Sequence, residues 1–295
     1  MMSPTLIADF LSFPSLITIG LGLSAALLWG VHDYCVRVFA SQADALALLL
    51  LVCAVGAVIM APAALLLGGW DQFTALTLSF SLISGVFYAV GAYGLYRAFA
   101  IGPVRLVAPI CGAYPFLSVA FHMLRGGAAG PIVWLGVLAI VGGIALVTRG
   151  EQEDAATHRV QAILWALMAA VGFAFTFGFS QWAAQTAPEI AVIWSARLMA
   201  GVSVVFAVMM RGVSIAPIFT MWRTAVLLGV LDTAALMLVA HAGGFPHAEY
   251  APVTASMFGI VTILLAWRFL KEPMRPLQWI GVLAAFAGTA VLSFV

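Results

Sequence analysis

Long runs of apolar residues, separated by short breaks that contain Gly, Pro or charged residues, make up most of the sequence. A bilayer span needs about 20 mostly apolar residues, and the runs predict ten such spans. The spans cover approximately residues 16–39, 44–67, 77–100, 103–124, 131–148, 160–183, 189–210, 219–243, 249–270 and 277–294. Because the breaks are short, we expect helices that are neighbours in sequence to pack antiparallel. The pattern therefore predicts an all-α integral membrane protein.

Composition excludes a soluble fold. Of the 295 residues, 64% are hydrophobic and 8% are charged, whereas soluble domains carry roughly 25% charged residues. A net charge of +1 gives no electrostatic reason to expect a nucleic-acid partner. The three cysteines have no CxxC spacing, so we expect no metal site, no disulfide framework and no cofactor. The first 15 residues contain no Lys or Arg, which argues against a cleaved signal peptide.

The chain contains an internal repeat. "PIVWLGVLAIVGGIALV" (131–147) and "PLQWIGVLAAFAGTAVL" (276–292) align without a gap and are identical at eight of seventeen positions. The charged segment 149–159 divides the ten spans into five and five, which predicts repeats over 1–148 and 160–295 joined by this linker. Because five is odd, the second repeat must insert with opposite topology. Inverted repeats around a central cavity are typical of secondary transporters, whose binding site lies near the midplane.

The distribution of Lys and Arg predicts the orientation in the membrane. Ten of these residues lie in or beside the loops that follow spans 1, 3, 5, 7 and 9, only Arg125 lies on the opposite side, and Arg197 is inside a span. Basic loops stay in the cytoplasm. We therefore expect both termini to face away from the cytoplasm.

Few ionisable side chains lie inside the spans, and such residues are functional candidates because charge in hydrocarbon is costly. The strongest are His32 and Asp33 in the first span, Arg197 in the seventh and Asp232 in the eighth. Asp33 is only about 9 Å from the predicted end of its span, so it could reach water. Two interpretations stay open: an acid and Arg197 neutralise each other within the protein, or these groups line a wet cavity and bind a charged substrate. In the second case Asp232 or Asp33 also exchanges a proton.

Aromatic residues add to this set. Trp29 shares one helical face with His32 and Asp33, at spacings of three and four residues. Tyr88 and Tyr114 lie inside their spans, where their hydroxyl groups need partners, and aligning the two repeats places Tyr88 opposite Asp232. For two further histidines, His122 and His241, packing or interfacial roles are favoured. The expected substrate-binding residues are Trp29, His32, Asp33, Tyr88, Tyr114, Arg197 and Asp232.

Three segments together resemble the EamA-like ten-helix branch of the drug/metabolite transporter superfamily. They are "ALLWG" (26–30), "YRAFAIGPVRLVAPICGAYP" (96–115) and "FLKEPMRPLQWIGVLAAFAGTAVL" (269–292). The resemblance covers essentially the whole chain and implies a small-metabolite carrier, commonly an exporter, with an aromatic-lined cavity between its halves. Members of the family often carry an acid between the fourth and fifth helix of each repeat. Here only the second repeat has it, as Glu272, whereas the first reads "LRGGAAGP".

These observations predict a multi-pass protein of the plasma membrane (the inner membrane in a bacterium) that carries a small polar or amphipathic metabolite by alternating access. We rank an amino acid first because the spans hold both signs of charge, and we expect proton coupling through Asp232 or Asp33. The partners are then the substrate and the lipid bilayer, with the protein a monomer or a homodimer. A facilitative channel or uniporter and an organic-cation or drug carrier are the alternatives. A membrane-embedded enzyme is the weaker one, because the sequence has no HExxH or GxSxG motif.

Overall fold

A computed structural model describes residues 13–40, 42–114, 116–117, 130–147, 156–216, 220–242, 244–245 and 250–293. Residues 149–155 of the predicted linker, and His122, lie outside the described residues. Within the described residues the chain forms helices and no strand.

Every predicted span contains helix. The first half forms α2 (Phe13–Phe39), α3 (Ala45–Leu67), the short 3-10 helix η1 (Trp70–Gln72), α4 (Ala75–Ile101), α5 (Val104–Gly112) and α7 (Pro131–Val147). The second half forms α8 (Ala156–Ala184), α9 (Glu189–Arg211), α11 (Trp222–Ala242), α12 (Tyr250–Ala255), α13 (Phe258–Phe269) and α14 (Pro276–Ser293). Six of these helices, namely α2, α3, α4, α8, α9 and α11, are long and apolar enough to cross a membrane.

Local chemistry explains several helix boundaries. Asp44 precedes α3 and its side chain accepts a hydrogen bond from the Leu46 amide (2.8 Å), which satisfies one free donor of the first turn. Thr74 does the same for α4 through the Thr77 amide (3.1 Å). α9 ends at Gly212, whose positive φ of 61° suits glycine.

The fourth and ninth predicted spans are each interrupted within their length. In both, a hydrogen bond to the third preceding residue tightens the chain: Ala113 N donates to Ile110 O and Met257 N donates to Thr254 O, each at 3.2 Å. A second such bond follows in each, from Phe116 to Ala113 (3.0 Å) and from Ile260 to Met257 (2.9 Å). The offset between the two breaks is close to that between the aligned repeats. Both copies of the repeat therefore break this helix at the same place.

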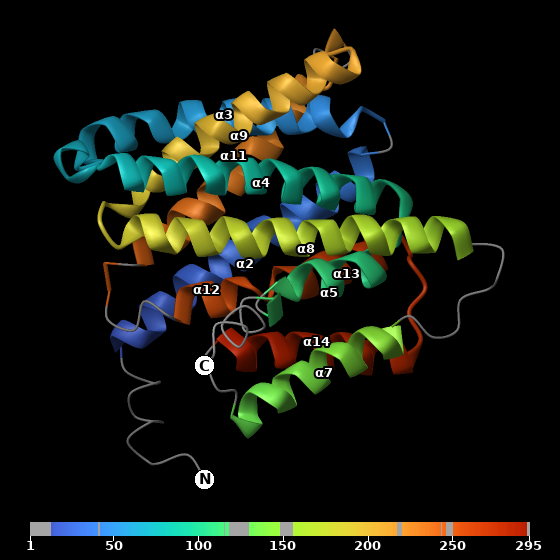
Figure 1. Ribbon diagram of the computed structural model, residues 1–295. Coiled ribbons are helices and arrows are strands. Elements are labelled where there is room, and N and C mark those ends of the chain that lie inside the picture. Colours follow the sequence, from blue (N-terminus) through green and yellow to red (C-terminus); the bar gives the residue numbers. More distant parts are fainter. Residues whose placement is uncertain are drawn as a thin grey trace.

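Helix packing follows the same two-fold relation. α2 packs on α11 in the way that α8 packs on α4, and α3 on α11 in the way that α9 packs on α4. α3 packs on α9 and α7 packs on α14, and each of these pairs joins equivalent helices of the two halves. Figure 1 shows α4 and α8 side by side and running in opposite directions, with α7 and α14 together at one edge. The prediction of two inverted five-helix repeats is confirmed.

The core joins the halves and the outer faces are apolar. One buried cluster includes Phe99 and Val107 from the first half and Ala166 and Phe286 from the second. Large apolar side chains such as Leu66 (82% exposed) and Met209 (74% exposed) point outward instead. An exposed apolar surface of this kind suits contact with lipid.

Candidate functional site

An ion pair between two long helices of the second repeat forms the centre of the site. Arg197 on α9 and Asp232 on α11 approach to 2.6 Å between Nη2 and Oδ2. Both residues are buried, with 3% and 6% of their surface exposed. A charge in such surroundings is costly unless it is paired. The pair therefore satisfies the first interpretation of these charges, that an acid neutralises Arg197.

Two residues from the first half complete the cluster. The Tyr88 hydroxyl on α4 accepts a hydrogen bond from Arg197 Nη1 (2.6 Å) and donates one to Asp232 Oδ2 (3.2 Å). Trp29 Nε1 on α2 donates to Asp232 Oδ1 (3.1 Å). The Arg197 guanidinium also lies 4.5 Å from the centre of the Tyr88 ring, a favourable cation–π distance. We call these four residues the central cluster; they come from four helices, two in each half.

A second polar group lies beside the central cluster on the same two helices of the first half. Nδ1 of His32 and Oδ1 of Asp33 are 2.9 Å apart, and Nε2 of His32 is 3.2 Å from the Tyr96 hydroxyl. Oδ2 of Asp33 is buried and has no hydrogen-bond partner. Asp33 is 3% exposed, so in this conformation it is packed within the protein.

Tyr96 is a member of this group that the sequence analysis did not select. It is 1% exposed and lies on α4 eight residues after Tyr88. Eight residues are slightly more than two helical turns, so both hydroxyl groups are on one face of the helix. The spacing of Tyr88 and Tyr96 on one predicted helix was the signal by which the sequence could have identified Tyr96 as a site residue.

Tyr114 is not part of either group. Its ring packs against Phe177 of α8, with 4.9 Å between the ring centres. His241 likewise packs against an aromatic ring, that of Phe245, at 5.3 Å. The structure thus brings six of the seven predicted residues into two adjacent groups and leaves Tyr114 in an aromatic contact.

A third group of polar contacts lies at the end of the bundle that carries most of the arginines. Arg37, one turn beyond Asp33 on α2, pairs with Glu272 (Nε to Oε1, 3.2 Å) and donates to the Phe99 carbonyl (2.7 Å). The other Glu272 oxygen accepts from the Val104 amide (2.9 Å), which is in the first turn of α5. Glu272 therefore links the second half to two helices of the first half, and we call this contact the latch.

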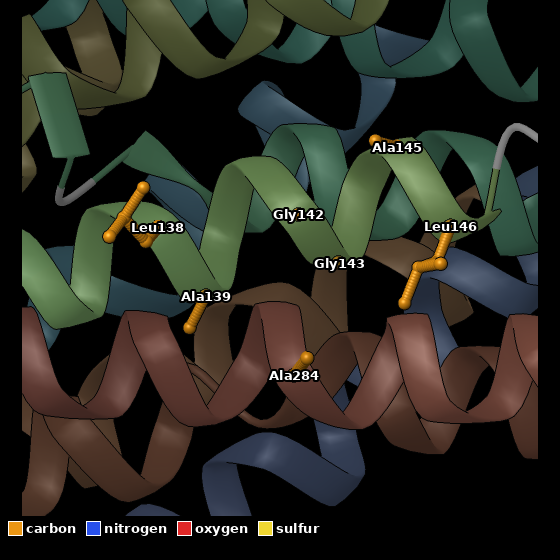
Figure 2. A pocket seen from close by; sticks show the side chains of 7 residues that line it. All are labelled: Leu138, Ala139, Gly142, Gly143, Ala145, Leu146 and Ala284. Atoms are coloured by element: carbon orange, nitrogen blue, oxygen red, sulfur yellow. The ribbon is translucent and has the colours of Figure 1, made fainter.

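A cavity of about 400 Å³ lies elsewhere, between α7 and α14. It is lined by Leu138, Ala139, Gly142, Gly143, Ala145, Leu146 and Ala284 (Figure 2). None of the central cluster lines it. A water-filled space at the centre of the protein stays a prediction, and among the described residues no group of three His, Cys, Asp or Glu side chains could hold a metal ion.

Inverted helical repeats and apolar outer faces define the class of protein as a multi-pass membrane protein. The profile of the EamA-like transporter family matches residues 16–149 and 160–294. The chain belongs to this family, whose members are transporters of small molecules and not enzymes.

Similarity to a solved structure supports the fold alone. One solved structure, described only as "Crystal structure of protein", is 18% identical over 93% of this chain and 95% of that chain, with a TM-score of 0.65. No curated protein matches.

Proposed function

We propose that this protein is a secondary active transporter that exports a small zwitterionic metabolite, with an amino acid the first candidate, across the plasma membrane by alternating access. The observation that carries the proposal is the Arg197–Asp232 pair, held between the two repeats by Tyr88 and Trp29. The distribution of Lys and Arg along the sequence supports an orientation in which the arginine-rich end of the bundle faces the cytoplasm.

The buried pair gives a physical basis for choosing a zwitterion. Removing one partner of a buried ion pair costs about 3–5 kcal/mol, because the other charge is left uncompensated. A substrate with both charges can replace both contacts at once, its carboxylate on Arg197 and its ammonium group on Asp232. A simple amine or a simple carboxylate replaces one contact and leaves the other charge unpaired. The Tyr88 ring and Trp29 then supply aromatic surface for the rest of the substrate.

Proton coupling is a separate part of the proposal. Asp232 has three partners, whereas one oxygen of Asp33 has none. We therefore rank Asp33, with His32 beside it, ahead of Asp232 as the group that exchanges a proton.

The proposal is tested by counterflow in liposomes that contain the purified protein. We expect loaded amino acid to drive uptake of labelled amino acid, with no effect of matched simple amines or carboxylates. Asp232→Asn should weaken binding of the zwitterion by more than about 100-fold, since the substrate ammonium group is then left without its carboxylate partner. Asp71→Asn is the matched control, because Asp71 is exposed in η1.

Three outcomes would reject this function. Full zwitterion counterflow by the Asp232→Asn protein would show that the ion pair does not bind substrate. Counterflow by amines alone would favour an organic-cation carrier. Ion conductance without saturation would favour a channel.

A further inference from the structure

A cavity at the arginine-rich end of the bundle has the chemistry of a lipid site. Its volume is about 450 Å³, and it lies between α4 and α8, lined by Arg97, Gln161, Leu164, Trp165 and Met168. None of these residues belongs to the central cluster or to the latch. We propose that this cavity binds an anionic phospholipid, with the lipid phosphate on Arg97.

One donor atom of the Arg97 guanidinium group has no hydrogen-bond partner. Its Nε atom is buried without a hydrogen-bond partner, and no carboxylate within the described residues forms an ion pair with it. The guanidinium instead lies 5.6 Å from the centre of the Trp165 ring. Guanidinium groups bind phosphate through two parallel hydrogen bonds, so a phosphate oxygen is a suitable acceptor for this donor.

Arg97 lies near one end of a helix that is long and apolar enough to cross a membrane, where lipid headgroups are expected. It lies four residues, or about 6 Å, before the end of α4. The start of α8 extends past the end of α4 at this side of the bundle (Figure 1). A second cation is close by, since Arg211 donates to the Tyr93 hydroxyl (2.7 Å) and the Tyr93 ring contacts Trp165 edge-on at 5.5 Å. Basic pockets between membrane helices are known to bind anionic headgroups.

The order of residues along α8 favours a lipid over a soluble phosphate. The polar residue Gln161 is nearest the end of the helix, and Leu164 (60% exposed) and Met168 follow one and two turns deeper. On the same stretch of the helix, Leu167 and Val171 also expose 49% and 40% of their surface. An amphipathic molecule fits this gradient, with its phosphate at Arg97 and Gln161 and an acyl chain along Leu164 and Met168.

The test measures lipid retention by native mass spectrometry, together with thermal stability, on the full-length protein in detergent. The added probes are phosphatidylglycerol, phosphatidylcholine and inorganic phosphate. We expect the wild-type protein to retain and be stabilised by phosphatidylglycerol in preference to the other two. Arg97→Gln should bind this lipid about fivefold more weakly. Arg223→Gln is the matched control, because Arg223 also lies 5.5 Å from a tryptophan ring, that of Trp222, but lines neither of the two cavities described here.

A second variant separates loss of binding from loss of folding. Leu164→Gln changes an exposed side chain and should lower phosphatidylglycerol retention by removing the apolar path. The proposal is overturned if Arg97→Gln and Leu164→Gln both retain the lipid as the wild-type protein does, or if phosphatidylcholine is retained equally well. It is also overturned, in favour of a soluble phosphate ester, if inorganic phosphate gives the same Arg97-dependent stabilisation.

Discussion

Two buried aspartates in this protein differ in how well their oxygens are satisfied. Asp232 is contacted by Arg197, Tyr88 and Trp29, so both of its oxygens have partners. Asp33 has His32 on one oxygen and no partner on the other. A buried carboxylate oxygen without a partner is costly, and binding a proton removes the charge. This contrast is the residue-scale reason for separating substrate binding from proton exchange.

The separation predicts a specific phenotype for Asp33→Asn. Exchange of substrate across the membrane requires no net proton movement, so counterflow should continue at close to the wild-type rate. Transport driven by a pH gradient should be lost, because asparagine cannot exchange a proton. Both are measured in the same liposomes, with Asp71→Asn as the control. Gradient-driven transport that persists in the Asp33→Asn protein would contradict this role.

At the scale of the helices, contact between α7 and α14 depends on glycine. A Cβ atom added at Gly143 would lie 2.5 Å from the Gly281 carbonyl oxygen and 2.6 Å from the Ala285 amide nitrogen. Both are backbone atoms, so the helices would have to separate. The neighbouring Gly142, also on α7 (Figure 2), has no heavy atom within 4 Å of such a position.

Because Gly143 is crowded and Gly142 is not, replacing each with alanine should change the free energy of unfolding in different ways. Gly143→Ala should lower the free energy of unfolding by about 1–3 kcal/mol through overpacking. Gly142→Ala should be neutral or slightly stabilising, because alanine favours helix over glycine. Thermal unfolding in detergent compares the two proteins directly. Equal melting temperatures would mean that α7 and α14 are not this close.

At the scale of the whole molecule, the latch makes the two ends of the bundle different. Glu272 connects the second half to α2 and α5 through Arg37 and the Val104 amide. The aligned segment of the first repeat, "LRGGAAGP", has no acid and cannot form the same contact. Two inverted repeats with identical contacts would close both ends equally. We therefore expect the latch to favour closure of the arginine-rich end.

Glu272→Gln tests this expectation. Losing a charged acceptor should release the first turn of α5, and the Val104 amide should exchange its hydrogen about tenfold faster. Hydrogen–deuterium exchange of peptides that cover the start of α5 measures the change. Glu189→Gln is the control, since it makes the same substitution at the exposed start of α9. Unchanged exchange in the Glu272→Gln protein would mean that the latch does not hold this end.

Much of the architecture was predictable because it depends on short stretches of chain. A run of apolar residues is long enough to span a bilayer or it is not, and two copies of a repeat can be aligned directly. The ten spans, the repeat and the class of protein followed from this. The break at 256–257 did not, because "VTASMFGIV" (253–261) has helix-compatible residues throughout. Its equivalent in the first repeat, at Ala113, had a signal in the sequence, because Pro109 lies four residues before it and proline can bend a helix.

The sequence by itself determined that this chain enters a membrane as two inverted units with a few charged residues inside them, since the free energy of insertion is set mainly by each segment's own composition. The tertiary structure alone decided which charges meet. Arg197 is paired with Asp232 and supported by Tyr88 and Trp29, whereas His32 contacts Tyr96 on α4. These partners are far apart in the chain, and their contacts depend on how helix faces are rotated and stacked, which no single segment specifies.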